Sequence, residues 1–245
     1  ILYVVDKRQE LHFIQVFRCA RKTGLVKEDT RLSFLGFGTM NGKDGKPFKT
    51  REGGVMRLEN LIADIDEEMF TKIVENRSVR DKDARDTAKI VGLAAIKYGD
   101  LSNQATKDYI FDVDRFTSFE GNTGPYILYT IVRIKSILNR YVQEGGDLSA
   151  GKILPAVNDS EKNLMLQLSG FAAMVENAFE EKAPHKICAY IYEVSNAFNS
   201  FYHETKILSE EDQAQKESFL QLLQLTRRVL ETSIDLLGFS APDRM

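Results

Sequence analysis

Long helical segments follow one another through the second half of the chain, from about Gly121 onward. They cover residues 126–143, 161–181 and 185–204, and a last segment ends at Leu237. Helices of this length that are joined by short connections pack as antiparallel bundles. We therefore expect an all-helical bundle here.

Capping residues mark the expected helix ends. Residues 123–125 have the sequence Thr-Gly-Pro, which predicts a helix start because proline at the first helical position loses no helical hydrogen bond. Asp159 or Ser160 is the expected cap of segment 161–181. Gly238 predicts the end of the last helix, since glycine readily adopts the left-handed conformation that terminates helices.

The first half of the chain mixes strands with helices. Residues 2–5 are apolar and rich in β-branched side chains, which predicts a strand, and Gly24 ends a helix predicted over residues 8–23. The expected fold class is therefore mainly α with a small α/β part. The other elements expected here are a strand over 31–40, helices over 57–74 and 87–99, and a strand over 109–111.

Residues 36–54 are rich in glycine and carry four basic side chains and one proline. Glycine and proline weaken helices, so a short strand, a turn at Asp44–Gly45 and a loop are expected. Backbone N–H groups and basic side chains in such a loop suit the oxygens of a nucleotide. By loop composition alone, a solvated hairpin is the more common structure for such a segment.

Charge divides unevenly along the chain, whose net charge is −3. Residues 1–116 hold 21 basic and 19 acidic side chains, whereas residues 117–245 hold 12 basic and 17 acidic ones. Because phosphate contacts require cations, the acidic helical half is a poor general binder of polyanions. Any RNA that it binds must be held by local patches and by bases stacked on aromatic rings.

Cysteine and histidine usage excludes some classes of site. The two cysteines, Cys19 and Cys188, lie far apart and lack metal-ligand spacing, and the three histidines do not cluster with them. We expect no protein-bound metal and a reducing, cytoplasmic location. The sequence contains no apolar run of membrane-spanning length and no leader, and it begins at Ile1 within a strand, so we expect a fragment with no membrane partner.

Four segments together resemble one family. They occur in the order and spacing of the C-terminal half of bacterial-type arginyl-tRNA synthetases, which are class I aminoacyl-tRNA synthetases. The segments are Tyr3–Phe13, Ala95–Ser102, Phe119–Tyr126 and Leu237–Met245. The resemblance implies that residues 1–115 are the C-terminal part of a Rossmann-type catalytic domain with the ATP loop. It implies that residues 116–245 are an all-helical, DALR-type anticodon-binding domain.

The same resemblance implies an activity. The intact protein would be an arginine–tRNA ligase that activates arginine with ATP and transfers it to tRNA(Arg). ATP would be a substrate, together with Mg²⁺, and no cofactor would be tightly bound. The missing N-terminal half of the polypeptide would carry the His-Ile-Gly-His-type signature, so the fragment alone is expected to be inactive.

Candidate catalytic residues come from two segments. Gln9 and His12 follow the first strand, where ligands of open α/β sheets bind, and the resemblance assigns Gln9 to arginine and His12 to the nucleotide side. Lys49, Thr50 and Arg51 stand where the family has its ATP-gripping signature. Lys46 is a second candidate clamp for the leaving phosphates.

Candidate tRNA-binding residues lie on the helical half. Tyr126, Tyr129 and Arg133 share a helical stripe that could stack a base and bind a phosphate, although such a stripe is also typical of a core. By the resemblance, Tyr202 and the terminal Met245 meet the anticodon loop. For Met245 the alternative is a frayed chain end.

The sequence departs from the family at two places, and two other functions stay open. Phe34 and Leu35 stand where a histidine is common, and residues 217–220 lack the usual Arg-Leu pair, so the corresponding contacts are not expected. One alternative is a stand-alone RNA-binding module without catalysis, which would not need the segment from Gln9 to Arg51. The other is a helical protein-interaction scaffold, which would have no affinity for RNA.

Overall fold

The computed structural model describes residues 1–46, 57–75 and 81–245, with the side chains of residues 81 and 82 left aside. These residues form two compact units. The described part of the first unit consists of residues 1–46 and 103–112, and the second consists of the described residues of 57–102 and 113–245.

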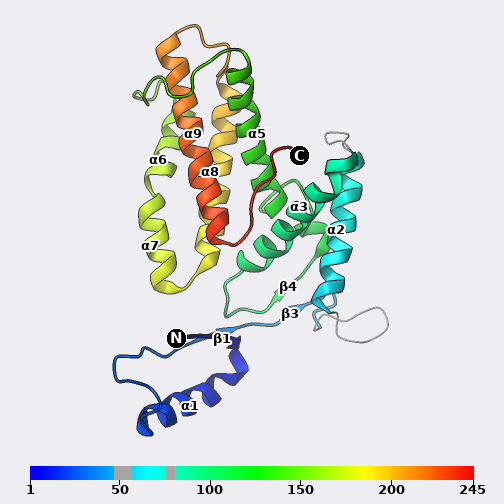
Figure 1. The fold of residues 1–245 in the computed structure, drawn as a ribbon, viewed down its shortest axis with the longest axis vertical. Helices are drawn as coiled ribbons and strands as arrows, with labels where there is room; N and C mark the ends of the chain where they lie inside the picture. Colours follow the sequence, from blue (N-terminus) through cyan, green and yellow to red (C-terminus); the bar gives the residue numbers. More distant parts are fainter. Residues whose placement is uncertain (47–56, 76–80) are drawn as a thin grey trace. The chain divides into compact units, whose positions relative to one another are not determined.

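The first unit contains two short parallel sheets. Strand β1 pairs with β2 from Leu2↔Ser33 to Asp6↔Phe37, and β3 pairs with β4 through Met40↔Tyr109. The elements are β1 (Leu2–Asp6), the 3-10 helix η1 (Lys7–Gln9), α1 (Glu10–Lys22), β2 (Ser33–Phe37), β3 (Met40–Asn41) and β4 (Tyr109–Ile110). Figure 1 shows these elements in blue, with β4 in green.

The single strand predicted over residues 31–40 was wrong, because the chain changes partners after Phe37. The Gly38 N–H donates to Ala105 O at 2.8 Å, and the Thr39 N–H donates to the Asp108 carboxylate at 2.8 Å. These bonds draw the chain away from β1 and onto the segment that leads into β4. The predicted strand is therefore divided into β2 and β3.

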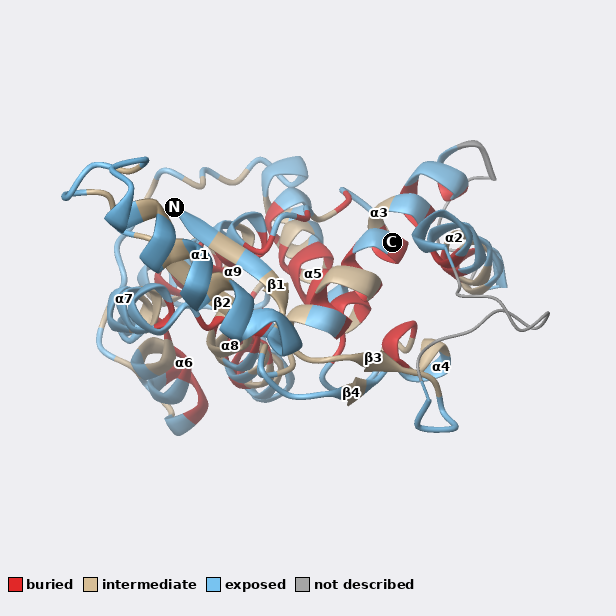
Figure 2. Ribbon diagram, turned by 90° about the horizontal axis from the view of Figure 1, so that it is seen from below, coloured by how far each residue is buried: buried red, intermediate tan, exposed pale blue. Residues whose placement is uncertain are grey.

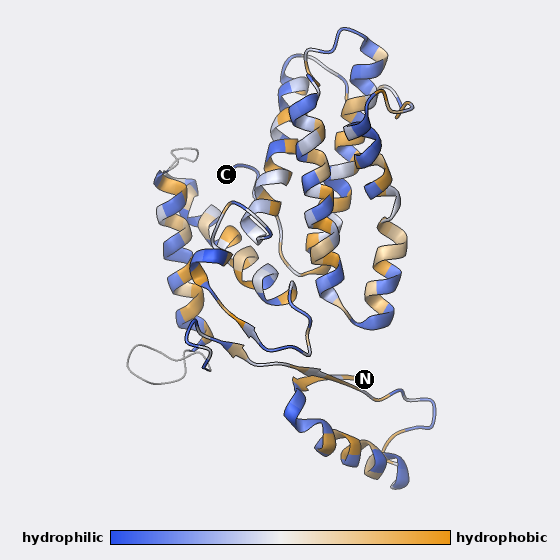
Figure 3. Ribbon diagram, turned by 180° about the vertical axis from the view of Figure 1, so that it is seen from behind, coloured by the Kyte–Doolittle hydropathy of each residue, from blue (hydrophilic) through white to orange (hydrophobic). Residues whose placement is uncertain are grey.

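Aromatic side chains pack α1 onto one face of the first sheet. The Phe13 ring lies 5.2 Å from Tyr3, 5.9 Å from Phe17 and 5.6 Å from Phe34 between centroids. The opposite face of β1 is apolar but open, with Leu2 47% and Val4 55% exposed. Figure 3 shows the apolar colouring of β1 and Figure 2 its exposure.

The second unit is entirely helical in its described part. Helix α2 packs on α3, and α3 packs on α5 and α8. Helices α5, α8 and α9 contact one another, and α6 and α7 pack on α8. The helices are α2 (Leu58–Glu75), α3 (Asp81–Leu101), α4 (Val113–Phe116), α5 (Gly124–Gln143), α6 (Asp159–Ser169), α7 (Phe171–Glu181), α8 (Pro184–Glu204) and α9 (Gln213–Leu236).

Helix ends agree with the sequence at two places and differ at two. The Thr123 side chain caps α5 by accepting from Tyr126 N, and Gly238 follows α9 with φ +79°. The helix predicted over 161–181 is instead two helices, α6 and α7, with Gly170 between them. Its cap is Asn158, whose side chain accepts from Glu161 N, and not Asp159 or Ser160.

The core of the second unit is formed by the inward faces of α3, α5, α8 and α9, which Figure 2 colours red. Tyr98, Phe198, Phe201 and Phe219 are fully buried there. Helices α2 and α3 belong to this unit by their contacts. The domain boundary predicted between residues 115 and 116 stays a prediction. No helix within the described ranges combines the length and the apolar character that crossing a membrane requires.

Gly124 lies where α5 approaches α3 most closely. A Cβ atom at this position would lie 2.3 Å from the carbonyl oxygen of Ala94. That atom is backbone and cannot move without shifting α3, so we expect Gly124→Ala to lower the free energy of unfolding by about 2 kcal/mol. Urea unfolding followed by circular dichroism measures this loss.

Gly170→Ala provides the matched control for this prediction. Its added Cβ would meet only Gln167 O, at 3.4 Å, and the φ of Gly170 is −78°. Alanine accepts that conformation, so this variant should be neutral or slightly more stable than wild type. Equal stabilities of the two variants would contradict the proposed close contact between α3 and α5.

Candidate functional site

Gln9 and His12 follow the carboxyl end of β1. Gln9 is the N-cap residue of α1, and its side chain makes no capping hydrogen bond. His12 lies in the first turn of α1, and its ring meets the Phe13 ring edge-on at 5.5 Å. Both side chains are exposed. An amide and an imidazole at this edge of a parallel pair are placed where small ligands bind in open α/β sheets.

The carboxyl ends of β1 and β2 are tied together by Asp108. Its carboxylate accepts from Lys7 Nζ at 2.8 Å and from Thr39 N at 2.8 Å. The Lys7 hydrogen bond, followed by the Thr39 hydrogen bond, lowers the pKa of Asp108. The carboxylate therefore stays ionised at neutral pH and joins the residue after β1 to a residue after β2.

Two glycines permit this close approach. A Cβ on Gly36 would lie 2.9 Å from Lys7 Cα, and a Cβ on Gly38 would lie 2.3 Å from Lys107 O. These two glycines are therefore needed for packing. Gly36 makes room for Lys7 of η1, and Gly38 makes room for the backbone of residues 107 and 108. The glycine-rich segment therefore begins at the carboxyl ends of β1 and β2, which is also the side of the sheet where Gln9 lies.

The predicted turn at Asp44–Gly45 is confirmed. Gly45 has φ +71° and its N–H donates to Gly42 O at 2.9 Å, while Lys46 N donates to the Asp44 carboxylate at 3.1 Å. The Lys46 side chain is exposed at the end of this turn. The sequence did not reveal the ion pair between Lys43 Nζ and Asp112, at 3.0 Å.

Lys49, Thr50 and Arg51, the predicted ATP-gripping residues, lie outside the described residues. Their role stays a prediction from the sequence. Within the described residues, Phe34, where the sequence departs from the family that it resembles, packs against Phe13.

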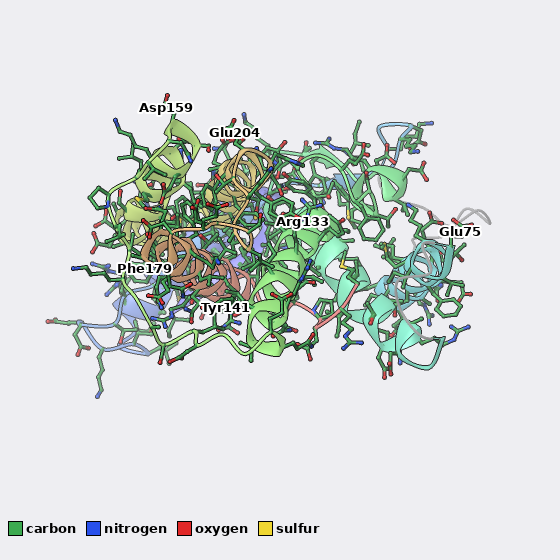
Figure 4. All side chains as sticks on the ribbon, turned by 90° about the horizontal axis from the view of Figure 1, so that it is seen from above. Glu75, Arg133, Tyr141, Asp159, Phe179 and Glu204 are labelled. Carbon is green, nitrogen blue, oxygen red and sulfur yellow. The ribbon has the colours of Figure 1, made fainter. Side chains whose placement is uncertain are left out.

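Tyr129, Arg133 and Tyr202 come together on α5 and α8, and are called the Tyr–Arg–Tyr cluster below. The Arg133 guanidinium carbon lies 4.6 Å from the centroid of the Tyr129 ring and 5.3 Å from that of Tyr202. Tyr129 is 41% and Tyr202 37% exposed. Figure 4 labels Arg133 on α5. A cation held over aromatic faces that remain partly open can accept a stacked base and a phosphate.

Phe198 supports this cluster from inside the bundle. Its ring is fully buried and stacks on Tyr202 with centroids 6.0 Å apart and an interplanar angle of 25°. The Tyr202 ring is therefore fixed by a rigid core residue on one side and remains open on another. Because Phe198 holds the Tyr202 ring, the orientation of this ring does not depend on a ligand.

Tyr126 points from α5 toward α8 and takes a different position from Tyr129. Its ring is half-buried against Tyr192, at 5.8 Å between centroids. Its hydroxyl donates to Asn196 Oδ1 at 2.8 Å and accepts from Asn199 Nδ2 at 2.8 Å. The Asn199 Oδ1 in turn accepts from Arg133 NH1 at 2.9 Å.

The sequence did not reveal Asn196 and Asn199, although it contains a signal for them. Asparagine is unfavourable inside helices, because its side chain competes for backbone hydrogen bonds. Two asparagines three residues apart inside the helix predicted over residues 185–204 therefore favour a polar contact to a neighbouring element.

The C-terminal segment after α9 runs along α3 and α5, as Figure 1 shows in red. Lys97 Nζ donates to Gly238 O at 2.7 Å, and Lys135 Nζ donates to Pro242 O at 3.4 Å. Pro242 is buried and Met245 is half-buried. The described structure therefore anchors the chain as far as Pro242.

Residues 217–220, the second place where the sequence departs from the family that it resembles, include core residues in this chain. The buried Ser218 hydroxyl accepts from Leu154 N at 2.9 Å, and Phe219 packs edge-on against Phe201 at 5.4 Å. This segment offers no arginine for an RNA contact.

Comparison with known proteins assigns two family models to the chain. Residues 1–113 match the family model "tRNA synthetases class I (R), catalytic domain", and residues 127–245 match the model "DALR anticodon binding domain". The arginine–tRNA ligase of Agathobacter rectalis is 66% identical over 253 residues, which is 100% of this chain and 42% of that protein. The chain belongs to the arginyl-tRNA synthetase family.

Other arginyl-tRNA synthetases agree with this assignment. The arginine–tRNA ligase of Alkaliphilus oremlandii is 59% identical over 245 residues, which is 100% of this chain and 42% of that protein. The arginyl-tRNA synthetase of Thermus thermophilus has 26% identity and a TM-score of 0.85 over 100% of this chain and 41% of its own. The chain thus spans about two fifths of the length of the relatives it matches.

The arginyl-tRNA synthetase family accounts for the fold class that the sequence predicted. The described structure is mostly helical with two small parallel sheets, and the catalytic part precedes the DALR helical part. The predicted roles of Gln9, His12, Lys46, Tyr126, Tyr129, Arg133, Tyr202 and Met245 stay predictions, and so does the boundary between residues 115 and 116.

The acidic side chains in the described ranges offer no obvious site for Mg²⁺. No group of three or more His, Cys, Asp or Glu side chains is arranged there to hold a metal ion.

Proposed function

We propose that the chain is part of an arginine–tRNA ligase, which activates arginine with ATP and transfers it to tRNA(Arg). The observation that supports this best is the ordered match of the whole chain to a class I arginine-type catalytic domain and a DALR anticodon-binding domain. The missing N-terminal half of the same polypeptide would supply the rest of the catalytic site. The relatives that the chain matches are long enough to contain such a half.

In the first step, an oxygen of the arginine carboxylate attacks the α-phosphorus of ATP, and pyrophosphate leaves. We assign Gln9 to the polar groups of arginine and His12 to the nucleotide side. Lys46, with Lys49, Thr50 and Arg51, would hold the leaving phosphates, because such reactions depend mainly on positioning and on cationic groups. Mg²⁺ would arrive with ATP and bind its phosphates.

In the second step, the arginyl group passes to the terminal ribose of the tRNA. We assign recognition of the anticodon to residues 116–245. Tyr129, Arg133, Tyr202 and Met245 would face the anticodon loop, and Tyr126 would take part in tRNA binding through its hydrogen bonds to α8. Support comes from the Tyr–Arg–Tyr cluster, whose rings are partly open and carry a cation between them. Single-stranded RNA loops are recognised by such stacking surfaces.

We place the protein in the cytoplasm, where a ligase of this kind acts on free tRNA. Cys19 and Cys188, which are the two cysteines of the chain, are both free. A thiol in each is what a reducing compartment maintains.

The proposal predicts that the anticodon controls binding. In the full-length polypeptide that contains this chain, tRNA(Arg) should bind at least tenfold more tightly than the same tRNA with an abasic nucleotide at its central anticodon position, since one well-stacked base contributes about 1–3 kcal/mol. Filter binding at several salt concentrations measures both dissociation constants.

The outcome distinguishes the proposal from the two alternatives. A stand-alone RNA-binding module without this recognition would bind both tRNAs with the same affinity. A protein-interaction scaffold would bind neither, whereas the proposal requires a salt-sensitive affinity because phosphate contacts release counterions. Either result would overturn the assignment of the helical unit to the anticodon.

A further inference from the structure

The Asn196–Tyr126–Asn199–Arg133 hydrogen-bond series has a fixed direction. The Arg133 guanidinium can only donate, so the group of Asn199 that faces it must be the oxygen. The Asn199 amide NH₂ then points at the Tyr126 hydroxyl, whose oxygen accepts this bond. The single proton of that hydroxyl is left to Asn196 Oδ1.

The surroundings of Tyr126 favour this direction. Burial raises the pKa of the Tyr126 phenol, so the hydroxyl keeps its proton at neutral pH and can donate it. Its ring packs against Tyr192, which leaves the hydroxyl between α5 and α8. Asn196 and Asn199 are both half-buried on α8. Each of the three bonds joins α5 to α8, and none depends on a ligand.

We infer that Asn199 and the Tyr126 hydroxyl are positioning residues for Arg133. They hold the guanidinium between the Tyr129 and Tyr202 rings before any RNA arrives, and they act on RNA only through it. The inference rests on the proposed function and deepens it. It gives Tyr126 a different task from Tyr129 and Tyr202, whose faces are open to a ligand.

The geometry supports this division of tasks. An arginine side chain that is free to rotate loses conformational freedom when it binds a phosphate or a base, and this loss weakens binding. In this chain Arg133 Nη1 already donates to Asn199 Oδ1 at 2.9 Å, and the guanidinium carbon lies over the Tyr129 and Tyr202 rings. The remaining N–H groups of the fork are oriented by these contacts.

A double-mutant cycle on the full-length polypeptide tests the inference. The variants are Asn199→Ala, Tyr126→Phe, Arg133→Ala and the two combinations with Arg133→Ala, and the readout is the dissociation constant for tRNA(Arg). We expect Asn199→Ala to weaken binding about tenfold, as expected when a hydrogen bond to a charged group is lost. Tyr126→Phe should weaken it about threefold, as for a neutral hydrogen bond. In the Arg133→Ala background, neither change should have any further effect.

Asn163→Ala is the matched control, since Asn163 is exposed on α6 and belongs to no part of the cluster. It should leave the dissociation constant unchanged. Thermal unfolding of every variant separates a structural role from a positioning role. If Asn199→Ala lowers the melting temperature but leaves tRNA affinity intact, Asn199 is merely structural and the inference is overturned.

Two other outcomes are equally decisive. If Tyr126→Phe weakens binding to the same extent with and without Arg133, the hydroxyl contacts RNA directly and the assigned role is wrong. If Arg133→Ala itself leaves binding unchanged, the proposed anticodon surface fails, and the inference fails with it. If Arg133→Ala weakens binding but Asn199→Ala does not, only the inference fails.

Discussion

The 245-residue chain, produced by itself, is expected to catalyse no arginine-dependent exchange between ATP and pyrophosphate. The first unit offers two strands of a parallel sheet with one covered face. Its other face is apolar and open at Leu2 and Val4. Parallel sheets in enzymes are covered on both faces, so this surface is suited to pack against further structure. By the proposed function, Gln9, His12 and Lys46 would supply only part of the catalytic site, and the missing N-terminal half would supply the rest.

Pyrophosphate exchange with labelled pyrophosphate measures this directly, with and without tRNA(Arg). The full-length polypeptide serves as the positive control and should exchange at a rate typical of an aminoacyl-tRNA synthetase. The chain alone should remain at the background rate, while it still binds tRNA through its second unit. Arginine-dependent exchange by the isolated chain would show that the catalytic site is complete within it.

Local sequence signals were sufficient for most of the second unit. Thr123 and Pro125 predicted the start of α5, and Gly238 the end of α9, because caps act within one helical turn. The break at Gly170 was missed for a physical reason. A single glycine inside a helical pattern costs only about 1 kcal/mol relative to alanine, so tertiary packing decides whether the helix continues.

The first unit shows where local signals fail. The division of the predicted strand 31–40 depends on Ala105 and Asp108, which lie about 70 residues further along the chain. No periodicity within the strand contains that information. The glycines at 36 and 38 suggested a loop for phosphates, and the structure gives them a second reason, which is the close approach of other backbone segments.

The contacts of the Tyr–Arg–Tyr cluster within α5 were predictable from the sequence, whereas those between α5 and α8 were not. Tyr129 and Arg133 are four residues apart, so their contact follows from helical spacing alone. Tyr202 joins them only because α8 packs beside α5 in one particular register. Asn199 reaches Arg133 for the same reason. Only the resemblance to a known family pointed to Tyr202 from the sequence.

Replacement of Tyr202 by alanine is expected to weaken binding of tRNA(Arg) by about 10- to 100-fold, because stacking of a base on an aromatic ring is worth about 1–3 kcal/mol. The ring is partly exposed, lies over the Arg133 guanidinium and is supported by the buried Phe198. Its loss would remove the platform and one of the two rings that hold Arg133. Tyr202→Phe should bind within about threefold of wild type, because the phenol oxygen adds at most one neutral hydrogen bond to the ring that stacks.

Phe179 allows a matched control for this test. It is an aromatic residue that is 82% exposed on α7, so Phe179→Ala removes a similar ring from a surface assigned no role. This variant should bind tRNA(Arg) like wild type. Deletion of Met245 should have a smaller effect than Tyr202→Ala, since the segment before it is held by Lys135 through Pro242. If Tyr202→Ala and the Met245 deletion both bind tRNA(Arg) as tightly as Phe179→Ala does, the anticodon loop meets a different surface of the helical unit.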